Sequence, residues 1–143
     1  MSSPLHARGL LDTSAVIDLE QIDVDALPAE VAVAAVTLAE LAAGPHATAD
    51  ADERARRQER LQRVEASFDP LPVDASVARA YGRVFAAALS SGRSPRGRRA
   101  FDMLIAATAV AAALPLYTRN PADFAGLEGL VEVVPIELPL APP

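Results

Sequence analysis

Four acidic residues of this sequence lie where strands or helices are expected to begin or end, and acids in such places can bind metals. Asp12 follows an apolar pair and precedes a Thr-Ser pair, and Asp102 opens a nearly all-apolar segment. Glu40 interrupts the apolar run VTLAELAAG, and Asp123 lies in the turn NPADF. Carboxylates brought close together repel and raise one another's pKa unless a cation neutralises them. If these four side chains converge, they form a site for a cation.

The chemistry of such a site follows from its ligands. All-oxygen sites select hard cations such as Mg²⁺ or Mn²⁺, whereas zinc prefers nitrogen and sulfur. A metal held by carboxylates polarises a phosphoryl oxygen, helps to deprotonate a water molecule and stabilises the leaving oxygen. We therefore expect Mg²⁺ or Mn²⁺ as the cofactor and hydrolysis of a phosphodiester as the reaction.

Each acid also has an explanation that involves no metal. Asp12 could cap a helix that begins at the following Thr or Ser, and taken alone that interpretation is favoured. Asp102 could complement the positive end of a helix dipole, and Asp123 could cap the short segment that follows it. Glu40 is harder to explain, because its apolar neighbours leave almost no polar face for a surface glutamate. The joint pattern therefore weighs more than any single acid.

The elements that must position these acids alternate between strands and helices. The expected strands are Gly9–Leu11, Val31–Ala35, Leu71–Val73, Leu116–Thr118 and Val131–Ile136. The expected helices run from Ala15 to about Glu20, from an N-cap at Thr37 to Ala43, through the polar segment 49–68, from a cap at Asp74 to a stop at Gly92, and from about Ala100 to Ala113. This alternation predicts an α/β fold in which a parallel sheet of about five strands has helices on both faces. Ligands of open parallel sheets gather beyond the carboxyl ends of the strands, so the four acids could converge there.

Length and composition narrow the possible classes of protein. A chain of 143 residues has the size of one domain, and we expect a single domain over 1–143 with flexible tails at 1–8 and 138–143. No apolar run is long enough to span a bilayer and no signal-peptide pattern is present, so we expect a cytoplasmic protein that does not enter the membrane. The absence of cysteine excludes disulfides, thiol nucleophiles and Cys-ligated metals.

All basic residues are arginines, and most of them fall into two clusters. The net charge of -6 argues against a broad, nonspecific surface for nucleic acid. The run from Arg54 to Arg63 alternates with glutamates at helical spacing, which favours an exposed helix face with internal ion pairs. Arg96, Arg98 and Arg99 precede Asp102 and could hold substrate phosphates near the metal, although a solvated loop explains them equally well.

The segments LLDTSAVIDL, VTLAELAAG and RRAFDMLIAATAVAAALPLYTRNPADF, in this order, resemble the motifs of PIN-domain ribonucleases. The likeness is greatest to the VapC toxins of bacterial toxin–antitoxin pairs, and it covers nearly the whole chain. It implies an acidic metal-binding quartet made of Asp12, Glu40, Asp102 and Asp123. It also implies that the carboxylates or the water are oriented by polar side chains at Thr13, Thr118 and Asn120.

This resemblance implies an endoribonuclease that uses Mg²⁺ or Mn²⁺ and leaves a 5′-phosphate and a 3′-hydroxyl. It further implies inhibition by a VapB-like antitoxin and formation of a homodimer. A receiver domain or a haloacid-dehalogenase-type phosphotransferase also gathers acids at strand ends, but those families use a lysine, and this chain has none. The remaining alternative is a PIN-like binding module whose acids no longer support turnover.

Overall fold

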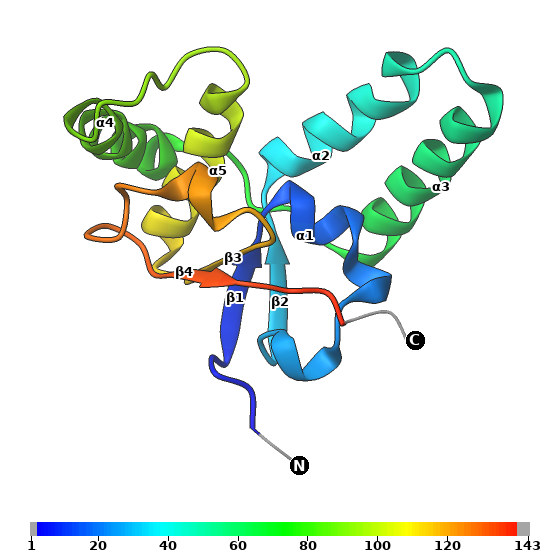
Figure 1. The fold of residues 1–143 in the computed structure, drawn as a ribbon, viewed down its shortest axis with the longest axis horizontal. Coiled ribbons are helices and arrows are strands. Elements are labelled where there is room, and N and C mark those ends of the chain that lie inside the picture. The colour runs from blue at the N-terminus through cyan, green and yellow to red at the C-terminus, as the bar shows by residue number, and fades with distance from the viewer. Residues whose placement is uncertain (1–2, 140–143) are drawn as a thin grey trace.

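A parallel four-stranded sheet forms the centre of the computed structural model, which describes residues 3–139 (Figure 1). Its strands lie in the order β2-β1-β3-β4, and every neighbouring pair is parallel. Their bounds are Arg8–Leu11 for β1, Glu30–Val33 for β2, Leu116–Thr118 for β3 and Val133–Pro135 for β4. The sheet confirms the predicted parallel α/β fold.

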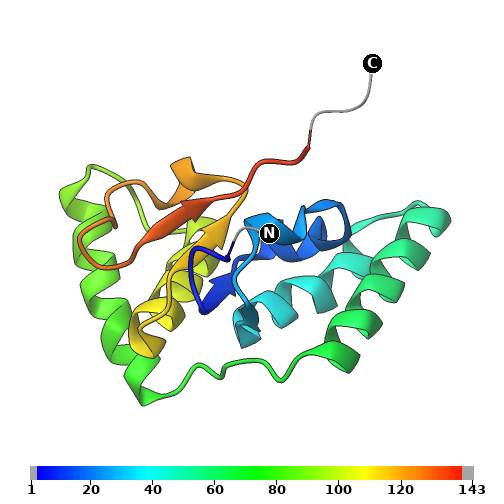
Figure 2. The ribbon, with the colours of Figure 1, turned by 90° about the horizontal axis from the view of Figure 1, so that it is seen from below.

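Helices cover both faces of this sheet. They are α1 (Thr13–Ile17), α2 (Ala35–Ala43), α3 (Ala51–Ser67), α4 (Ala75–Ser90) and α5 (Arg99–Ala112). Short 3-10 turns are η1 (Leu19–Gln21), η2 (Val24–Ala26), η3 (Gly44–Ala47) and η4 (Pro121–Phe124). Figures 1 and 2 show α4 and α5 together on one side of the strands, and α2 and α3 together on the other.

Alternating side chains of the strands supply the two cores. Leu10 and Leu116 are fully buried on the face that α4 and α5 cover. Their neighbours Leu11 and Tyr117 are equally buried on the opposite face, against α1 and α3. Successive side chains of a strand point to opposite faces, and full burial of one such leucine is worth roughly 1.5–3 kcal/mol. Because both faces are apolar, the sheet must be covered on both sides, as the near-continuous apolar strands predicted.

Two predicted details differ in the structure. The segment predicted as a strand at Leu71 makes only one parallel bridge, to Ala34, because Pro72 has no N–H to extend the pairing. Thr37 is not an N-cap, so that prediction is wrong. The helix α2 begins directly after the bridge at Ala34, which leaves Thr37 inside the helix and fully buried.

The first residues of the described chain are tied to the sheet. Arg8 begins β1, and the N–H groups of Ala29 and Glu30 donate to the carbonyls of His6 and Ala7 at 3.1 and 2.8 Å. Backbone hydrogen bonds to the rest of the chain therefore reach residue 6, within the tail expected at 1–8, whose flexibility stays a prediction. Residues 1–2 and 140–143 of the expected tails lie outside the described residues. Within 3–139, no helix combines the length and the apolar character that crossing a membrane requires.

Candidate active site

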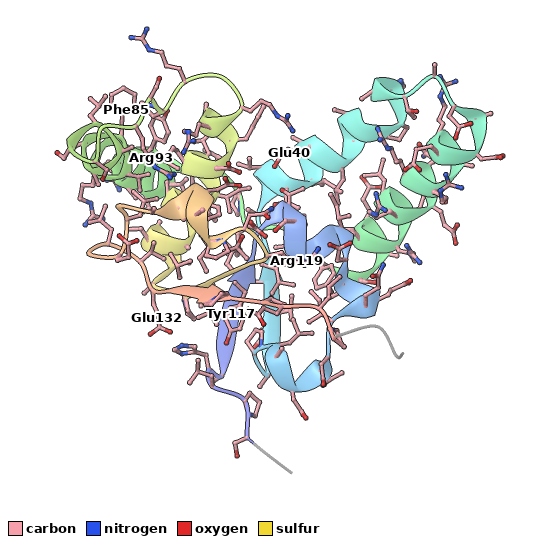
Figure 3. The ribbon with its side chains drawn as sticks, viewed as in Figure 1. Glu40, Phe85, Arg93, Tyr117, Arg119 and Glu132 are labelled. Atoms are coloured by element: carbon pink, nitrogen blue, oxygen red, sulfur yellow. The ribbon has the colours of Figure 1, made fainter. Side chains whose placement is uncertain are left out.

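The carboxyl ends of the strands open into a cleft with a volume of about 710 Å³. Asp12 comes directly after β1, Glu40 lies in α2 directly after β2, Asp102 is in the first turn of α5, and Asp123 is in η4 beyond β3. All four line this cleft. The cleft lies where α2 and α5 diverge beyond the strand ends, and Glu40 marks its α2 side in Figure 3. The structure thus brings together the four acids that the sequence analysis singled out.

Asp12 is held in position by three hydrogen bonds, and only 4% of it is exposed. Its Oδ1 accepts from the Ala15 N–H at 3.0 Å and from the Ser14 hydroxyl at 2.7 Å, and its Oδ2 accepts from the Thr118 hydroxyl at 2.5 Å. Burial raises the pKa of this carboxyl, although the three hydrogen bonds partly offset the rise. Asp12 is therefore both the cap of α1 and a wall of the cleft, so the two interpretations of this residue do not compete.

Glu40 is fixed by a threonine from the neighbouring helix. The Thr13 hydroxyl donates to Glu40 Oε1 at 2.6 Å and lies 3.0 Å from the hydroxyl oxygen of Thr37. Thr37 and Glu40 are three residues apart in α2, so both face α1. This contact explains how a glutamate occupies an otherwise apolar stretch: its carboxylate lies at the cleft and not on the outer surface.

Asp102 shows the electrostatic consequence of the cluster. Burial, followed by the negative charges of Asp123, Glu40 and Asp12, raises its pKa to about 6. The positive charge of Arg99 acts in the opposite direction but does not cancel the rise. Negative charge in the cleft therefore exceeds the positive charge that the chain itself supplies there.

A divalent cation fits the donor chemistry of this cleft. Within residues 3–139, no three His, Cys, Asp or Glu side chains converge closely enough to form a ready metal site. The four acids nevertheless line one cleft, and the pKa of Asp102 is raised first by burial and then by the negative charges of the other three. A hard cation with oxygen ligands would relieve this repulsion, and His and Cys do not compete because the cleft has neither.

The three polar residues predicted to support the acids lie at the cleft in different ways. Thr13 and Thr118 donate to the carboxylates, as described above. Asn120 lines the cleft, and its backbone N–H donates to the Thr118 hydroxyl at 2.9 Å. Ser14 was not predicted, yet it bonds Asp12 and accepts from the Arg119 N–H at 3.1 Å. A Ser two residues after a strand-end Asp could have indicated this role, because both side chains bond nearby backbone groups.

The three candidate phosphate-binding arginines are divided between two places. Arg98 and Arg99 line the acid cleft, so the structure keeps them near the four acids. Arg96 does not reach the cleft and lines a separate hollow with Phe85 and Arg93, both labelled in Figure 3. A contact between Arg96 and a substrate phosphate therefore stays a prediction that the cleft lining does not support. Gly97, which lies between Arg96 and the start of α5, has a φ of 68°, a left-handed conformation that glycine adopts readily.

Comparisons with known proteins agree with this architecture. The family model described as "PIN domain" matches residues 9–129. Ribonuclease VapC5 of Mycobacterium tuberculosis is 42% identical over 134 residues, which span 92% of this chain and 96% of the relative. The crystal structure of VapBC-5, a member of the VapBC family of toxin–antitoxin systems from the same organism, matches with a TM-score of 0.78 and 43% identity over 90% of this chain and 98% of that one. The crystal structure of FitAcB from Neisseria gonorrhoeae matches with a TM-score of 0.63 and 28% identity over 87% of this chain and 94% of that one.

Proposed function

The chain belongs to the PIN-domain family, and on this premise we propose that it is a VapC-type endoribonuclease that hydrolyses RNA phosphodiesters with Mg²⁺ or Mn²⁺. The observation that carries the proposal is the cleft at the strand ends, which is lined by four acids and by only two arginines. The identity to a named ribonuclease over almost the whole chain supports RNA as the substrate.

The proposed roles of the residues follow from their contacts. Asp12, Glu40, Asp102 and Asp123 would hold the metal. When bound, the metal would polarise the phosphoryl oxygen and make a water molecule more acidic. Asp12 is kept in one orientation by its three hydrogen bonds, and Thr13 does the same for Glu40. Such outer hydrogen bonds orient metal-binding carboxylates, and their loss typically lowers metal affinity or activity roughly 10- to 100-fold.

A VapB-like antitoxin is the proposed regulatory partner. The support comes from a relative at 43% identity, VapBC-5, whose solved structure is described as a member of the VapBC family of toxin–antitoxin systems. An antitoxin that acts at the active site would cover the acid cleft or displace its metal. Homodimer formation remains a prediction from the family resemblance.

Cleavage of total cellular RNA by the purified, antitoxin-free protein tests the proposal. The reactions contain Mg²⁺, Mn²⁺ or EDTA, and they compare the wild-type protein with Asp12→Asn. The matched control is Asp74→Asn, because Asp74 caps α4 through the Val77 N–H at 3.0 Å as Asp12 caps α1, but lies away from the cleft. Asn caps helices as well as Asp does, so both variants should fold.

We expect discrete fragments from the wild-type protein and from Asp74→Asn with either metal, and none with EDTA or Asp12→Asn. Fragments that persist in EDTA or in the Asp12 variant would overturn the proposal. A folded protein that cuts no RNA with either metal would favour the binding-module alternative.

A further inference from the structure

Phe101 is an aromatic residue in an unusual environment for this protein. The chain has six aromatic residues, and among them Phe101 is the exposed one, with 46% of its surface accessible. It immediately precedes Asp102 and lines the same cleft as the four acids. The other five aromatic side chains are buried or partly buried, so exposure of a large ring is specific to this place.

The position of Phe101 follows from the geometry of α5. Ile105 and Thr108 lie four and seven residues further along the helix on the same side, and both are buried in the core. The first turn of α5 extends beyond that core, so the same side of the helix meets the cleft at Phe101. The ring therefore lines the acid cleft from a helix and not from a loop.

The opposite wall of the cleft is also partly apolar. Ile17 at the end of α1 is 41% exposed, and Ala39 and Ala43 are exposed on α2. Arg98 and Arg99, one turn or less from the ring, supply positive charge on the α5 side. The cleft thus combines acids, arginines and a flat apolar surface.

A ligand that matches this combination has phosphate groups and flat apolar faces joined at short intervals, which describes single-stranded RNA. Every base has a π-face that stacks on an aromatic ring whatever its identity. A base inside a duplex has both faces covered by its neighbours, so it cannot stack on a protein ring without leaving the helix. A purely apolar peptide would leave the two arginines without a partner.

We propose that Phe101 is a specificity-determining residue whose ring stacks on an unpaired base next to the scissile phosphate, and so selects unpaired RNA and places the phosphate over the acids. This inference rests on the proposed ribonuclease function. It assigns the ring to binding and orientation of the substrate, and it assigns no proton transfer or metal binding to it.

The test uses Phe101→Ala, Phe101→Leu and Phe101→Tyr in the full chain, with Leu89→Ala as control. Leu89 is 55% exposed on α4 and lies outside the acid cleft, so its truncation removes an exposed apolar side chain elsewhere. Cleavage sites in total RNA are first mapped with the wild-type enzyme. A short single-stranded RNA across one mapped site is then made intact and with single abasic positions on either side of the cut.

We expect Phe101→Ala to lower kcat/KM on the intact RNA by roughly 5- to 150-fold, the range that stacking of one base provides. Phe101→Leu should lose nearly as much, Phe101→Tyr should retain activity, and Leu89→Ala should match the wild type. One abasic position should slow the wild-type enzyme by a similar factor and should not slow Phe101→Ala any further. This lack of additivity identifies the stacked base, since a merely structural role for the ring would slow every substrate equally.

The outcomes separate this inference from the proposed function. If the wild-type protein cuts RNA but Phe101→Ala cuts the intact RNA equally fast, the stacking role is wrong and the ribonuclease function stands. The same conclusion follows if Phe101→Ala and the abasic position act additively. If the wild-type protein cuts no RNA, the proposed function fails first, and the stacking role fails with it.

Discussion

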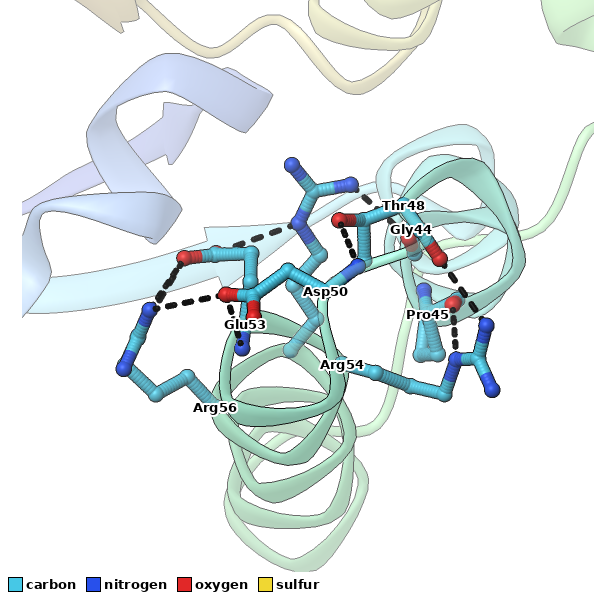
Figure 4. Close-up of polar contacts among 8 residues, drawn as sticks. Gly44, Pro45, Thr48, Asp50, Glu53, Arg54 and Arg56 are labelled. Atoms are coloured by element: carbon cyan, nitrogen blue, oxygen red, sulfur yellow. Dashed lines mark hydrogen bonds and ion pairs between the residues drawn. The ribbon is translucent and has the colours of Figure 1, made fainter.

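The acid cleft and the first turn of α3 contain the same kinds of side chain but have opposite electrostatics. In α3, Glu53 Oε2 lies 2.9 Å from Arg56 Nη2 and Glu53 Oε1 lies 3.2 Å from Arg57 Nε, as Figure 4 shows in part. Hydrogen bonds from these two arginines lower the pKa of Glu53. In the cleft, burial and neighbouring carboxylates raise the pKa of Asp102 to about 6.

Most arginines of α3 are paired with groups of the protein, whereas those of the acid cleft are not paired with carboxylates in the part of the chain that the structure describes. Arg54 donates to the carbonyls of Pro45 and Thr48 at 3.1 and 3.0 Å, visible in Figure 4, so its donors are used to hold η3 against α3. Within residues 3–139, neither Arg98 nor Arg99 forms an ion pair with a carboxylate. Charges that compensate one another locally stabilise a helix, whereas the uncompensated charges of the cleft are available to a ligand.

The largest expected effect is the stabilisation of the protein by a divalent metal, which should depend on the acid cleft and not on α3. The wild-type protein should gain about 2.7 kcal/mol of stability at a metal concentration 100 times the dissociation constant. Without metal, Asp102→Asn should be more stable than the wild type, because it removes a negative charge that is partly buried beside other carboxylates. The variant should gain little stability when Mg²⁺ or Mn²⁺ is added. Glu53→Gln in α3 should gain as much as the wild type. Thermal unfolding with increasing metal measures these differences.

A gain in Asp102→Asn equal to that of the wild type would show that Asp102 does not hold the metal. A reduced gain in Glu53→Gln would show that the two regions are not electrostatically independent. Because each variant replaces an acid by its amide, the two changes in charge are matched.

The pH dependence of stability should have opposite signs in the two regions. The folded-state pKa of Asp102 lies above its usual value of 3.8, so the folded protein binds this proton more tightly than the unfolded chain. Its contribution should therefore destabilise the metal-free protein increasingly as the pH rises from about 4 to about 6, and fully above that range. The lowered pKa of Glu53 contributes stability above its usual value of 4.5 that is lost as the pH falls.

Urea unfolding in EDTA between pH 4 and 7.5 measures this difference. At each pH, the free energy of unfolding of the variant is subtracted from that of the wild type, which cancels the titration of all other groups. The stability advantage of Asp102→Asn should grow with pH, and the deficit of Glu53→Gln should shrink as the pH falls. A flat difference curve for Asp102→Asn would mean that its carboxyl is not shifted in the folded protein.

The same contrast explains which features could be predicted from the sequence. The position of Asp12 and Glu40 was predictable, because apolar segments too short for helices predicted parallel strands, and such strands end at one edge of the sheet. The ion pairs of α3 were predictable from spacing alone, because residues three and four apart on a helix are neighbours. Both inferences depend only on local periodicity and one general rule of sheet architecture.

Features that depend on the packing of separate elements were not predictable. Gly97 lies between Arg96 and Arg98 and signals a turn, but the sequence does not indicate which of these arginines the fold brings to the cleft. The exposure of Phe101 depends on where the core ends along α5, since an apolar residue in an apolar helix would ordinarily be assigned to the core. Thr37 had the sequence context of a cap, but the bridge between Ala34 and Leu71 starts the helix earlier.

The ion pairs of α3 should give the smallest effect. Arg56→Ala removes two contacts to Glu53, but the Arg56 side chain is 60% exposed, and ion pairs at the surface contribute little and are screened by salt. We expect the melting temperature to fall by no more than roughly 2–4 °C at low salt, and by less at 1 M NaCl. RNA cleavage and the stabilisation by metal should not change, because Arg56 lies outside the cleft. A loss of cleavage by folded Arg56→Ala would instead place this face of α3 in the substrate-binding surface, and the distinction between compensated and available charges would no longer separate structural from functional arginines.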